Sequence, residues 1–189
     1  MTGSPDGFTG NMWTGQKKWC KIRKERGFAM FGFLTVGTTL TMLDLALKNE
    51  IESQKDETFP RDLEGTKGLI RLHKNHNQGF SFGVLEGSRA VELIPLCMTS
   101  ALAGAWVFLM GTKGRILEKL AVTLSLAGGA SNLIDRMKRG YVVDYFCIQW
   151  KALKKVVFNL GDIFIFFGSA LLLTAGLIDT LKDNWRSAK

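Results

Sequence analysis

Long stretches without charged residues constrain this sequence more than any other feature. The chain has 189 residues, with 25 Lys and Arg and 17 Asp and Glu, but these charges are concentrated in a few segments. Between them lie windows of about 20 residues, the helical length that crosses the roughly 30 Å hydrocarbon core of a bilayer. The pattern argues against a soluble globular protein and predicts an integral membrane protein.

Four windows are predicted to be transmembrane helices, and they cover residues 27–47, 93–112, 116–134 and 156–178. The third is the weakest, because its uncharged part is residues 120–134, about 22 Å of helix. Glu118 and Lys119 are therefore expected to snorkel at its end. Four spans place both termini on one side of the membrane, and the density of Lys and Arg weakly favours the cytoplasm. The predicted fold class is an α-helical integral membrane protein with four transmembrane helices.

The segment before the first window is rich in Gly, Ser and Thr and then in basic residues. We expect residues 1–26 to form a disordered basic arm in the cytoplasm, residues 27–182 the membrane domain, and residues 183–189 a cytoplasmic tail. A cleaved signal peptide would have its apolar region nearer the start. The net charge of +8 is typical of basic segments beside a membrane, which bind anionic lipids. No nucleic-acid partner is therefore expected.

Polar residues cluster on one face of the third window. Gly128, Asn132 and Arg136 follow each other at intervals of four, and Asp135 lies seven residues after Gly128. These spacings put all four residues in a narrow sector of one helical face. Ionisable residues in membrane helices are costly, so they mark candidate functional positions. The alternative is a helix end that emerges into water, with Gly128 allowing tight packing.

Two carboxylates stand out near the last window. Asp144 lies in a short apolar, β-prone run at residues 141–146, and Asp162 opens the last apolar helix. The connection between them is short enough to bring both to the same membrane face. Two carboxyl groups at one partly desolvated site share a proton, so the pair can act as base toward water and as acid toward a leaving amine. For Asp162 alone, a helix N-cap is the alternative.

Two further patterns lie outside the third and fourth windows. Asp44 and Lys48 are four residues apart at the end of the first window, which predicts a structural ion pair that snorkels at a helix end. Asn77, Gly79 and Phe82 form an N-x-G-x-x-F pattern in the long loop, which indicates extended or turning backbone at the membrane surface. By itself this loop pattern is a weak signal.

Metal and cysteine chemistry have little support in the sequence. His73 and His76 form an H-x-x-H pattern without an obvious third ligand, which is more typical of a solvated loop than of a metal site. Three scattered cysteines predict no disulfide framework. We find neither a G-x-x-x-x-G-K-[ST] nor an H-E-x-x-H motif, so nucleotide hydrolysis and zinc proteolysis lose their usual signatures.

In their order along the chain, these patterns resemble signal peptidase II, the membrane-embedded aspartic lipoprotein signal peptidase of bacteria. The resemblance covers residues 28–181. It rests on Asp44 with Lys48, the N-x-G-x-x-F element at 77–82, a G-x-x-x-N-x-x-D-R element at 128–136 that runs into 140–145, and a segment at 158–162 similar to F-N-x-A-D. Five elements in one order are hard to obtain by accident.

The resemblance implies a catalytic dyad of Asp144 and Asp162. The positions implied to bind substrate are Asn77, Gly128, Asn132, Arg136 and Asn159, and those implied to support the structure beside the site are Asp44, Lys48, Gly79 and Asp135. The implied fold has four transmembrane helices, a small β-rich extracytoplasmic cradle and cytoplasmic termini. The implied reaction cleaves a diacylglyceryl-modified prolipoprotein just before its lipid-modified cysteine, near the outer face of the bacterial inner membrane, without metal or organic cofactor.

Three positions depart from the family pattern. Gly161 stands where Ala is usual, Ser131 stands where Gly is common, and Phe80 with Ser81 replaces two small residues. Each departure is expected to alter fit rather than chemistry, because no proton-transfer group is lost. Phe80 is expected to narrow or reshape the pocket for the lipid-bearing cysteine.

Two other functions are kept as alternatives to the peptidase. One is a relative that binds lipopeptides without cutting them, which the retention of both acids argues against. The other is a small transporter, in which a proton or cation path uses the acids Asp44, Asp135, Asp144 and Asp162. The gathering of these acids near one predicted membrane face, with apolar residues in the middle of the spans, argues against a transporter.

Overall fold

The structure is a computed structural model that describes residues 9–79 and 89–187, with side chains from residue 27 onward. The long helices are α1 (Thr9–Ser53), α2 (Ala90–Gly111), α3 (Ile116–Arg139) and α4 (Leu160–Ser187), and the strands are β1 (Arg61–Asp62), β2 (Ile70–Asn77) and β3 (Val142–Ile148). Two short 3-10 helices, η1 (Asp56–Thr58) and η3 (Lys151–Lys155), follow α1 and β3. Phe80 and Phe82 lie outside the described residues.

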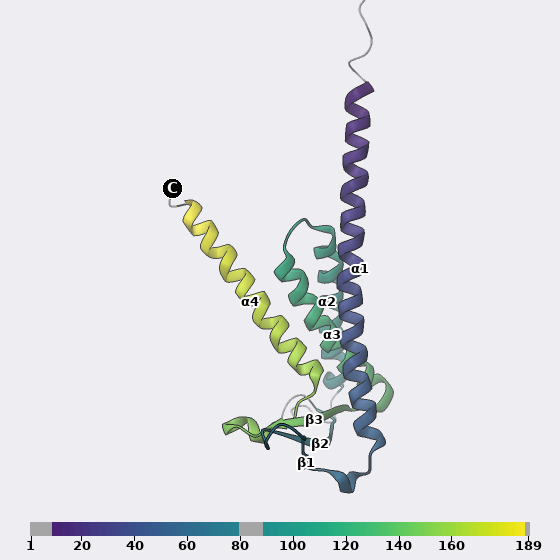
Figure 1. Ribbon diagram of the computed structural model, residues 1–189, viewed down its shortest axis with the longest axis vertical. Coiled ribbons are helices and arrows are strands. Elements are labelled where there is room, and N and C mark those ends of the chain that lie inside the picture. Colours follow the sequence, from purple (N-terminus) through teal and green to yellow (C-terminus); the bar gives the residue numbers. More distant parts are fainter. Residues whose placement is uncertain (1–8, 80–88, 188–189) are drawn as a thin grey trace, which may run out of the picture.

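The helices extend from one side of a small sheet, and α4 diverges from α1 with distance from it (Figure 1). The first turn of α1 and the last turn of α4 lie at the end away from the strands. Helix α3 packs against α1, α2 and α4, most extensively against α4. The architecture is therefore a helical bundle around α3 with a sheet across one end.

Helix α3 takes the central place because it presents small and polar residues. Its buried residues are Glu118, Lys119, Ala121, Val122, Thr123, Ser125, Ala127, Gly128, Ser131 and Asp135. A side chain at Gly128 would collide with the backbone of Gly161, so this glycine allows α3 and α4 to approach closely. Large apolar side chains instead project outward from the surrounding helices, among them Phe28, Phe108 and Leu173. Small residues between helices and large apolar residues outside are typical of bundles in lipid.

In the part of the chain that the structure describes, three helical segments are long and apolar enough to cross a membrane: Gly27–Ser53, Ala90–Gly111 and Leu160–Ser187. Helix α3 is not among them, although the sequence predicts a span at 116–134. Its charges do not snorkel as expected. Glu118 and Lys119 are buried, because Glu118 pairs with Arg115 and the Lys119 ammonium donates to the Thr112 carbonyl at the end of α2.

Helices α1 and α4 have boundaries that differ from the sequence prediction. Helix α1 begins at Thr9, so residues 9–26 continue the helix where a disordered arm was expected. Lys, Arg, Gln and Glu in this segment are good helix formers, which favours this continuation. Helix α4 begins at Leu160 and not at 156, because Phe158 is extended and pairs with Phe146 of β3. At its other end α4 runs to Ser187, through most of the expected tail.

The sheet is antiparallel in the order β1-β2-β3. In the β2–β3 register Asn77 lies opposite Val142, and Asn75 lies opposite Asp144. Val143 and Tyr145 of β3 pack on Ile51, near the end of α1, in a small apolar cluster. This cluster holds β3 against the bundle, so that Asp144 lies at the junction of sheet and helices.

Candidate active site

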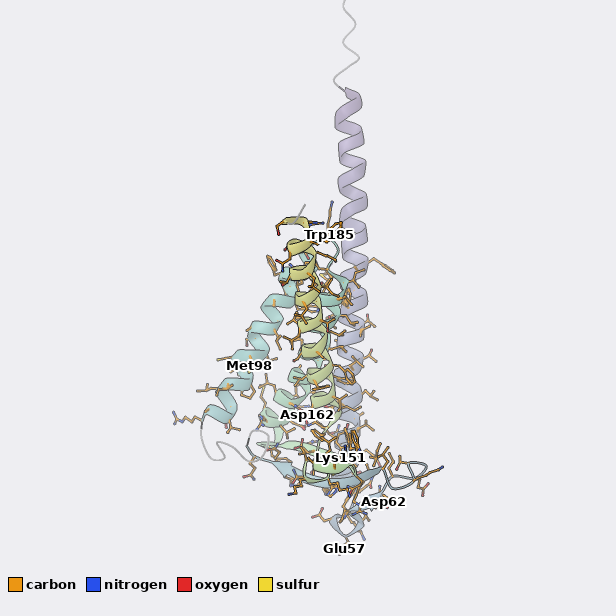
Figure 2. The ribbon with its side chains drawn as sticks, turned by 90° about the vertical axis from the view of Figure 1, so that its left-hand side faces the viewer. Glu57, Asp62, Met98, Lys151, Asp162 and Trp185 are labelled. Carbon is orange, nitrogen blue, oxygen red and sulfur yellow. The ribbon has the colours of Figure 1, made fainter. Side chains whose placement is uncertain are left out.

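Asn159 connects the two carboxylates of the predicted dyad. Its Nδ2 donates to Asp144 Oδ1 at 2.7 Å. Its backbone N donates to Asp162 Oδ2 at 3.2 Å, while its own Oδ1 accepts from the Asp162 backbone N at 2.9 Å. This reciprocal pair has the geometry of a capping box at the start of α4. Figure 2 shows Asp162 at the level where the helices meet the sheet.

Each carboxylate also accepts a hydrogen bond from the side-chain amide of a second asparagine. Asn77 Nδ2 at the end of β2 donates to Asp144 Oδ2 at 3.0 Å, and Asn132 Nδ2 of α3 donates to Asp162 Oδ1 at 3.0 Å. Burial raises the pKa of Asp144 to about 7, and the neighbouring charge of Asp162 contributes to the shift. The site therefore holds two adjacent carboxyl groups, and Asp144 is protonated through much of the range below neutral pH.

A buried cluster of charges lies beside the two carboxylates. The Lys48 ammonium is 2.9 Å from Asp44 Oδ2 and 3.4 Å from Asp135 Oδ2. It also donates to Asn132 Oδ1 at 2.7 Å and to Ser131 Oγ at 3.2 Å. The expectation that Asp44 and Lys48 snorkel at a helix end is wrong, since both side chains are 0% exposed. They are enclosed because β3 and the start of α4 cover the end of α1.

The acids of this cluster connect α1, α3, β3 and α4. Asp44 Oδ1 accepts from the Tyr145 hydroxyl at 3.0 Å and from the Leu160 backbone N at 3.1 Å. Asp135 Oδ2 accepts from the Val143 backbone N at 3.1 Å, and Asp135 Oδ1 pairs with Arg139 at 2.9 Å. The backbone on both sides of Asp144 and just before Asp162 is thereby fixed.

Arg136 and Gly79 form the side of the site toward the end of β2. Arg136 Nη2 donates to the Gly79 carbonyl at 2.7 Å, and the Gly79 backbone N donates to Asn77 Oδ1 at 3.1 Å. Among the described residues, Arg136 Nη1 is buried and has no hydrogen-bond partner. Gly128, predicted on the same face of α3, meets the backbone of Gly161.

Two residues of the network were not identified from sequence. Tyr145 was not singled out, yet its hydroxyl both donates to Asp44 and accepts from the Leu160 backbone N. Ser131 was treated only as a departure from the family pattern, yet its Oγ donates to Asp44 Oδ2 at 2.6 Å. The available signal for Ser131 was its spacing of four from Asp135, which places both on the side of α3 toward α1.

His73 and His76 both lie in strand β2. His76 Nε2 lies 2.7 Å from Glu52 Oε1, and its ring stacks on Tyr141 with centroids 4.2 Å apart. Across residues 27–79 and 89–187, whose side chains the structure describes, there is no group of three His, Cys, Asp or Glu side chains placed to hold a metal ion.

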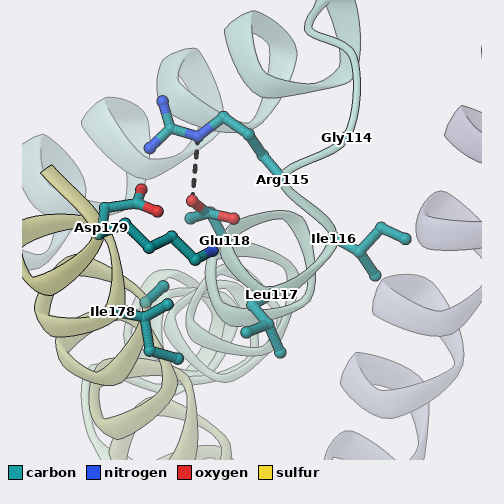
Figure 3. A pocket seen from close by; sticks show the side chains of 9 residues that line it. Gly114, Arg115, Ile116, Leu117, Glu118, Ile178 and Asp179 are labelled. Atoms are coloured by element: carbon teal, nitrogen blue, oxygen red, sulfur yellow. Dashed lines mark hydrogen bonds and ion pairs between the residues drawn. The ribbon is translucent and has the colours of Figure 1, made fainter. Parts of the chain in front are cut away.

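A separate pocket of about 320 Å³ lies between the start of α3 and the end of α4. It is lined by Arg115, Glu118, Asp179 and Lys182 together with apolar residues, and Arg115 Nε donates to Glu118 at 3.0 Å (Figure 3). Glu118 is 14 residues before Asn132, about 21 Å along the helix. This pocket therefore belongs to the opposite end of the bundle from the carboxylates.

Comparison with known proteins identifies the family. The family described as Signal peptidase (SPase) II matches residues 36–178. The chain belongs to the signal peptidase II family. The lipoprotein signal peptidase of Sinorhizobium fredii is 28% identical over 116 residues, covering 61% of this chain and 70% of its own. That of Brucella ovis is 28% identical over 145 residues, covering 77% and 89%.

Two solved structures share the fold. A bacterial membrane enzyme determined in meso at 2.3 Å has a TM-score of 0.66 and 22% identity, covering 78% of this chain and 88% of its own. A second, at 1.9 Å, has a TM-score of 0.63 and 21% identity, covering 77% and 92%. Membership of the signal peptidase II family makes the chain a peptidase, and its apolar helices make it a membrane protein.

Proposed function

We propose that the chain is an intramembrane aspartic endopeptidase that removes the signal peptide from diacylglyceryl-modified prolipoproteins, cutting just before the lipid-modified cysteine. The observation that carries the proposal is the contact of Asp144 and Asp162 with one residue, Asn159, at the junction of sheet and helices. The names of the lipoprotein signal peptidases that this chain resembles support the substrate class.

Asp144 and Asp162 would divide the proton transfers between them. Asp162 lies in the first turn of α4, where the helix N-terminus favours negative charge, so it serves as the base. It takes a proton from water as the water oxygen bonds to the scissile carbonyl carbon, while protonated Asp144 gives its proton to the carbonyl oxygen. The tetrahedral intermediate then collapses, the C–N bond breaks, and the amine leaves with the proton held by Asp162. As the carbonyl group forms again, one of the two hydroxyl groups of the intermediate returns its proton to Asp144. No metal or organic cofactor takes part.

The amides and the guanidinium around the dyad would bind the substrate backbone. The side chains of Asn77, Asn132 and Asn159 donate to the two carboxylates. They therefore lie beside the dyad, where the scissile part of the substrate would bind. Arg136 is anchored through Nη2 to Gly79, and its Nη1 is free among the described residues to donate to a peptide carbonyl. Gly128 would contribute by allowing α3 to lie close to the start of α4.

We further propose that α3 is the fourth transmembrane helix. It has 24 residues, about 36 Å of helix, and three apolar helices surround it. Its charged residues lie at its two ends. Four spans place both termini on one side of the membrane. The basic residues before Gly27 favour the cytoplasmic side of the bacterial inner membrane for both termini. The sheet and the dyad then lie near the outer face, where a lipid-anchored substrate has its modified cysteine.

The test is cleavage of a diacylglyceryl-modified precursor by the purified full chain in detergent or proteoliposomes, with the products identified by mass spectrometry. We expect release of the signal peptide and a product that begins with the lipid-modified cysteine, with unchanged rate in the presence of EDTA. The matched control is the same precursor without the lipid, which should remain intact. Absence of cleavage, with proton uptake into proteoliposomes instead, would support the transporter alternative.

A further inference from the structure

Lys48 is a completely buried cation, and four oxygen atoms of the described residues contact its ammonium group. Its ammonium contacts Asn132 Oδ1 at 2.7 Å and Asp44 Oδ2 at 2.9 Å. Ser131 Oγ and Asp135 Oδ2 complete the surroundings at 3.2 and 3.4 Å. Burying an ammonium group is costly unless it is paired, and here two carboxylates compensate its charge. The other two contacts are to neutral groups, and the one to the Asn132 amide is the shortest of the four.

This short contact determines how the Asn132 amide is oriented. An ammonium group only donates hydrogen bonds, so it requires the amide oxygen of Asn132 to face it. The amide nitrogen must then point the other way, and it donates to Asp162 Oδ1 at 3.0 Å. Without Lys48 the amide can turn over and present its oxygen to Asp162. That orientation suits only a protonated Asp162, which can donate a hydrogen bond.

We propose that Lys48 is a positioning residue for the dyad: it fixes the Asn132 amide so that its nitrogen always faces Asp162 and keeps this carboxylate ready to accept a proton. The inference rests on the proposed peptidase function, because it assigns Asp162 the role of base. It gives Lys48 a part in proton transfer although its ammonium bonds to neither carboxylate of the dyad.

Other charged groups lie around Lys48 and Asp162. Asp44 and Asp135 flank Lys48, and Asp135 is also paired with Arg139. Asp162 is in turn influenced by Asp144 and Arg136, from β3 and from α3. A loss of Lys48 therefore alters both the net charge near the dyad and the orientation of one amide, and the test must separate these two effects.

The test is the pH dependence of the cleavage rate of the full chain for Lys48→Met, Asn132→Leu and the double variant. We expect each single substitution to move the rising limb of the pH–rate profile to higher pH by about one pH unit or more, as expected for loss of a partner of a carboxylate. Because Lys48 orients the Asp162 partner through Asn132, adding Lys48→Met to Asn132→Leu should move the limb less than Lys48→Met does alone, and the remainder is the effect of the lost charge. Additive shifts, or an unchanged limb in Lys48→Met, would overturn the proposal.

Lys119→Met is the matched control, because Lys119 is also a buried lysine but its ammonium donates to the Thr112 carbonyl at the far end of α3. It should leave the rising limb unchanged. If Lys48→Met does not fold, Asp44→Asn/Lys48→Met keeps the net charge of the cluster and should show the same shift.

Infrared spectroscopy tests the role of Lys48 without a measurement of cleavage activity. A protonated Asp162 has a carbonyl band, which is identified by its loss in Asp162→Asn. This band should be absent at neutral pH in the unsubstituted chain and present in Lys48→Met. An equal band in both proteins would overturn the proposal. If the unsubstituted chain does not cleave the precursor, the proposed function fails, whereas the band still tests the role of Lys48.

Discussion

Buried charged residues lie at both ends of α3, but their partners come from different distances along the chain. At the end near α2, Glu118 pairs with Arg115 three residues away, and Lys119 donates to Thr112 seven residues away. At the sheet end, Lys48 reaches Asn132, which is 84 residues away, and Asp44 accepts from the Leu160 backbone N, which is 116 residues away.

We interpret the local arrangement as structural and the long-range one as part of the proposed active site. A local turn suffices to place the partners of Glu118 and Lys119. The sheet end instead requires α1, α3, β3 and α4 to meet, and it buries several polar groups whose desolvation is costly. Such a network is expected where chemistry needs fixed polar groups, so substitutions at the two ends should have unequal effects on catalysis.

The largest expected effect is on the dyad. Asp144→Asn and Asp162→Asn should each lower the cleavage rate by about 10²–10⁴-fold, because an amide has a similar shape but cannot exchange the proton. The matched substitution at the other end, Glu118→Gln, should leave the rate close to that of the unsubstituted chain. Initial rates on the lipid-modified precursor, with thermal melting as a check of folding, measure the contrast. A normal rate in either dyad variant would remove that acid from the mechanism.

The stability of the folded chain should depend on pH through Asp144. Its pKa of about 7 in the folded chain lies above the ordinary value of 3.8, so the folded state retains the proton that the unfolded state has lost between these values. The stabilisation is therefore present below about pH 4 and is lost as the pH rises to about 7. Asp144→Asn does not titrate, so it should gain stability relative to the unsubstituted chain over this range.

The gain should amount to a few kcal/mol, since one pKa unit corresponds to about 1.4 kcal/mol. Thermal melting of both proteins as a function of pH measures it, with Glu118→Gln as the control that should show no such gain. A constant difference between Asp144→Asn and the unsubstituted chain would contradict the raised pKa.

Gly161 and Ser131 are predicted to be coupled through Asp44. A methyl group at Gly161 would lie 2.9 Å from Asp44 Oδ2, the oxygen that Ser131 Oγ holds at 2.6 Å. Gly161→Ala should therefore destabilise the chain by about 1–3 kcal/mol, as expected for an overpacked site. In Ser131→Gly/Gly161→Ala the acid is freer to move, and part of this loss should be recovered. Melting temperatures of the four proteins test the coupling, and strictly additive effects would show that Asp44 does not transmit it.

The smallest effect is expected at the far end of α3. The Arg115 side chain is half exposed, so its ion pair with Glu118 should contribute at most about 1 kcal/mol. Arg115→Gln should lower the melting temperature slightly and leave the cleavage rate unchanged. A large loss of rate would indicate that the two ends of α3 are coupled, and it would contradict the interpretation that the end near α2 is only structural.

The sequence was sufficient to predict the helices and the candidate acids, because apolar windows and motif order are local properties. The short connection between Asp144 and Asp162 also indicated that both acids could lie at the same membrane face. Sequence could not show the burial of Asp44 and Lys48, since a lone pair at a helix end resembles a solvated one. Their enclosure depends on β3 pairing with β2 across a long loop and on Tyr145 reaching Asp44.

Asn159 shows the same limit within the site. The family resemblance implied only a substrate contact for Asn159, whereas the structure gives it a capping box with Asp162 and a hydrogen bond to Asp144. A single side chain with these roles is recognisable only when the strand and the helix start are placed together.

The most direct test of the central claim compares Asp144→Asn, Asp162→Asn and Asp144→Asn/Asp162→Asn in cleavage of the lipid-modified precursor. If the two carboxyl groups act as one unit, the double variant should be no slower than either single variant, because the first substitution already removes the whole effect. A double variant whose loss is the product of the two single losses would show that the acids act independently and would contradict the dyad.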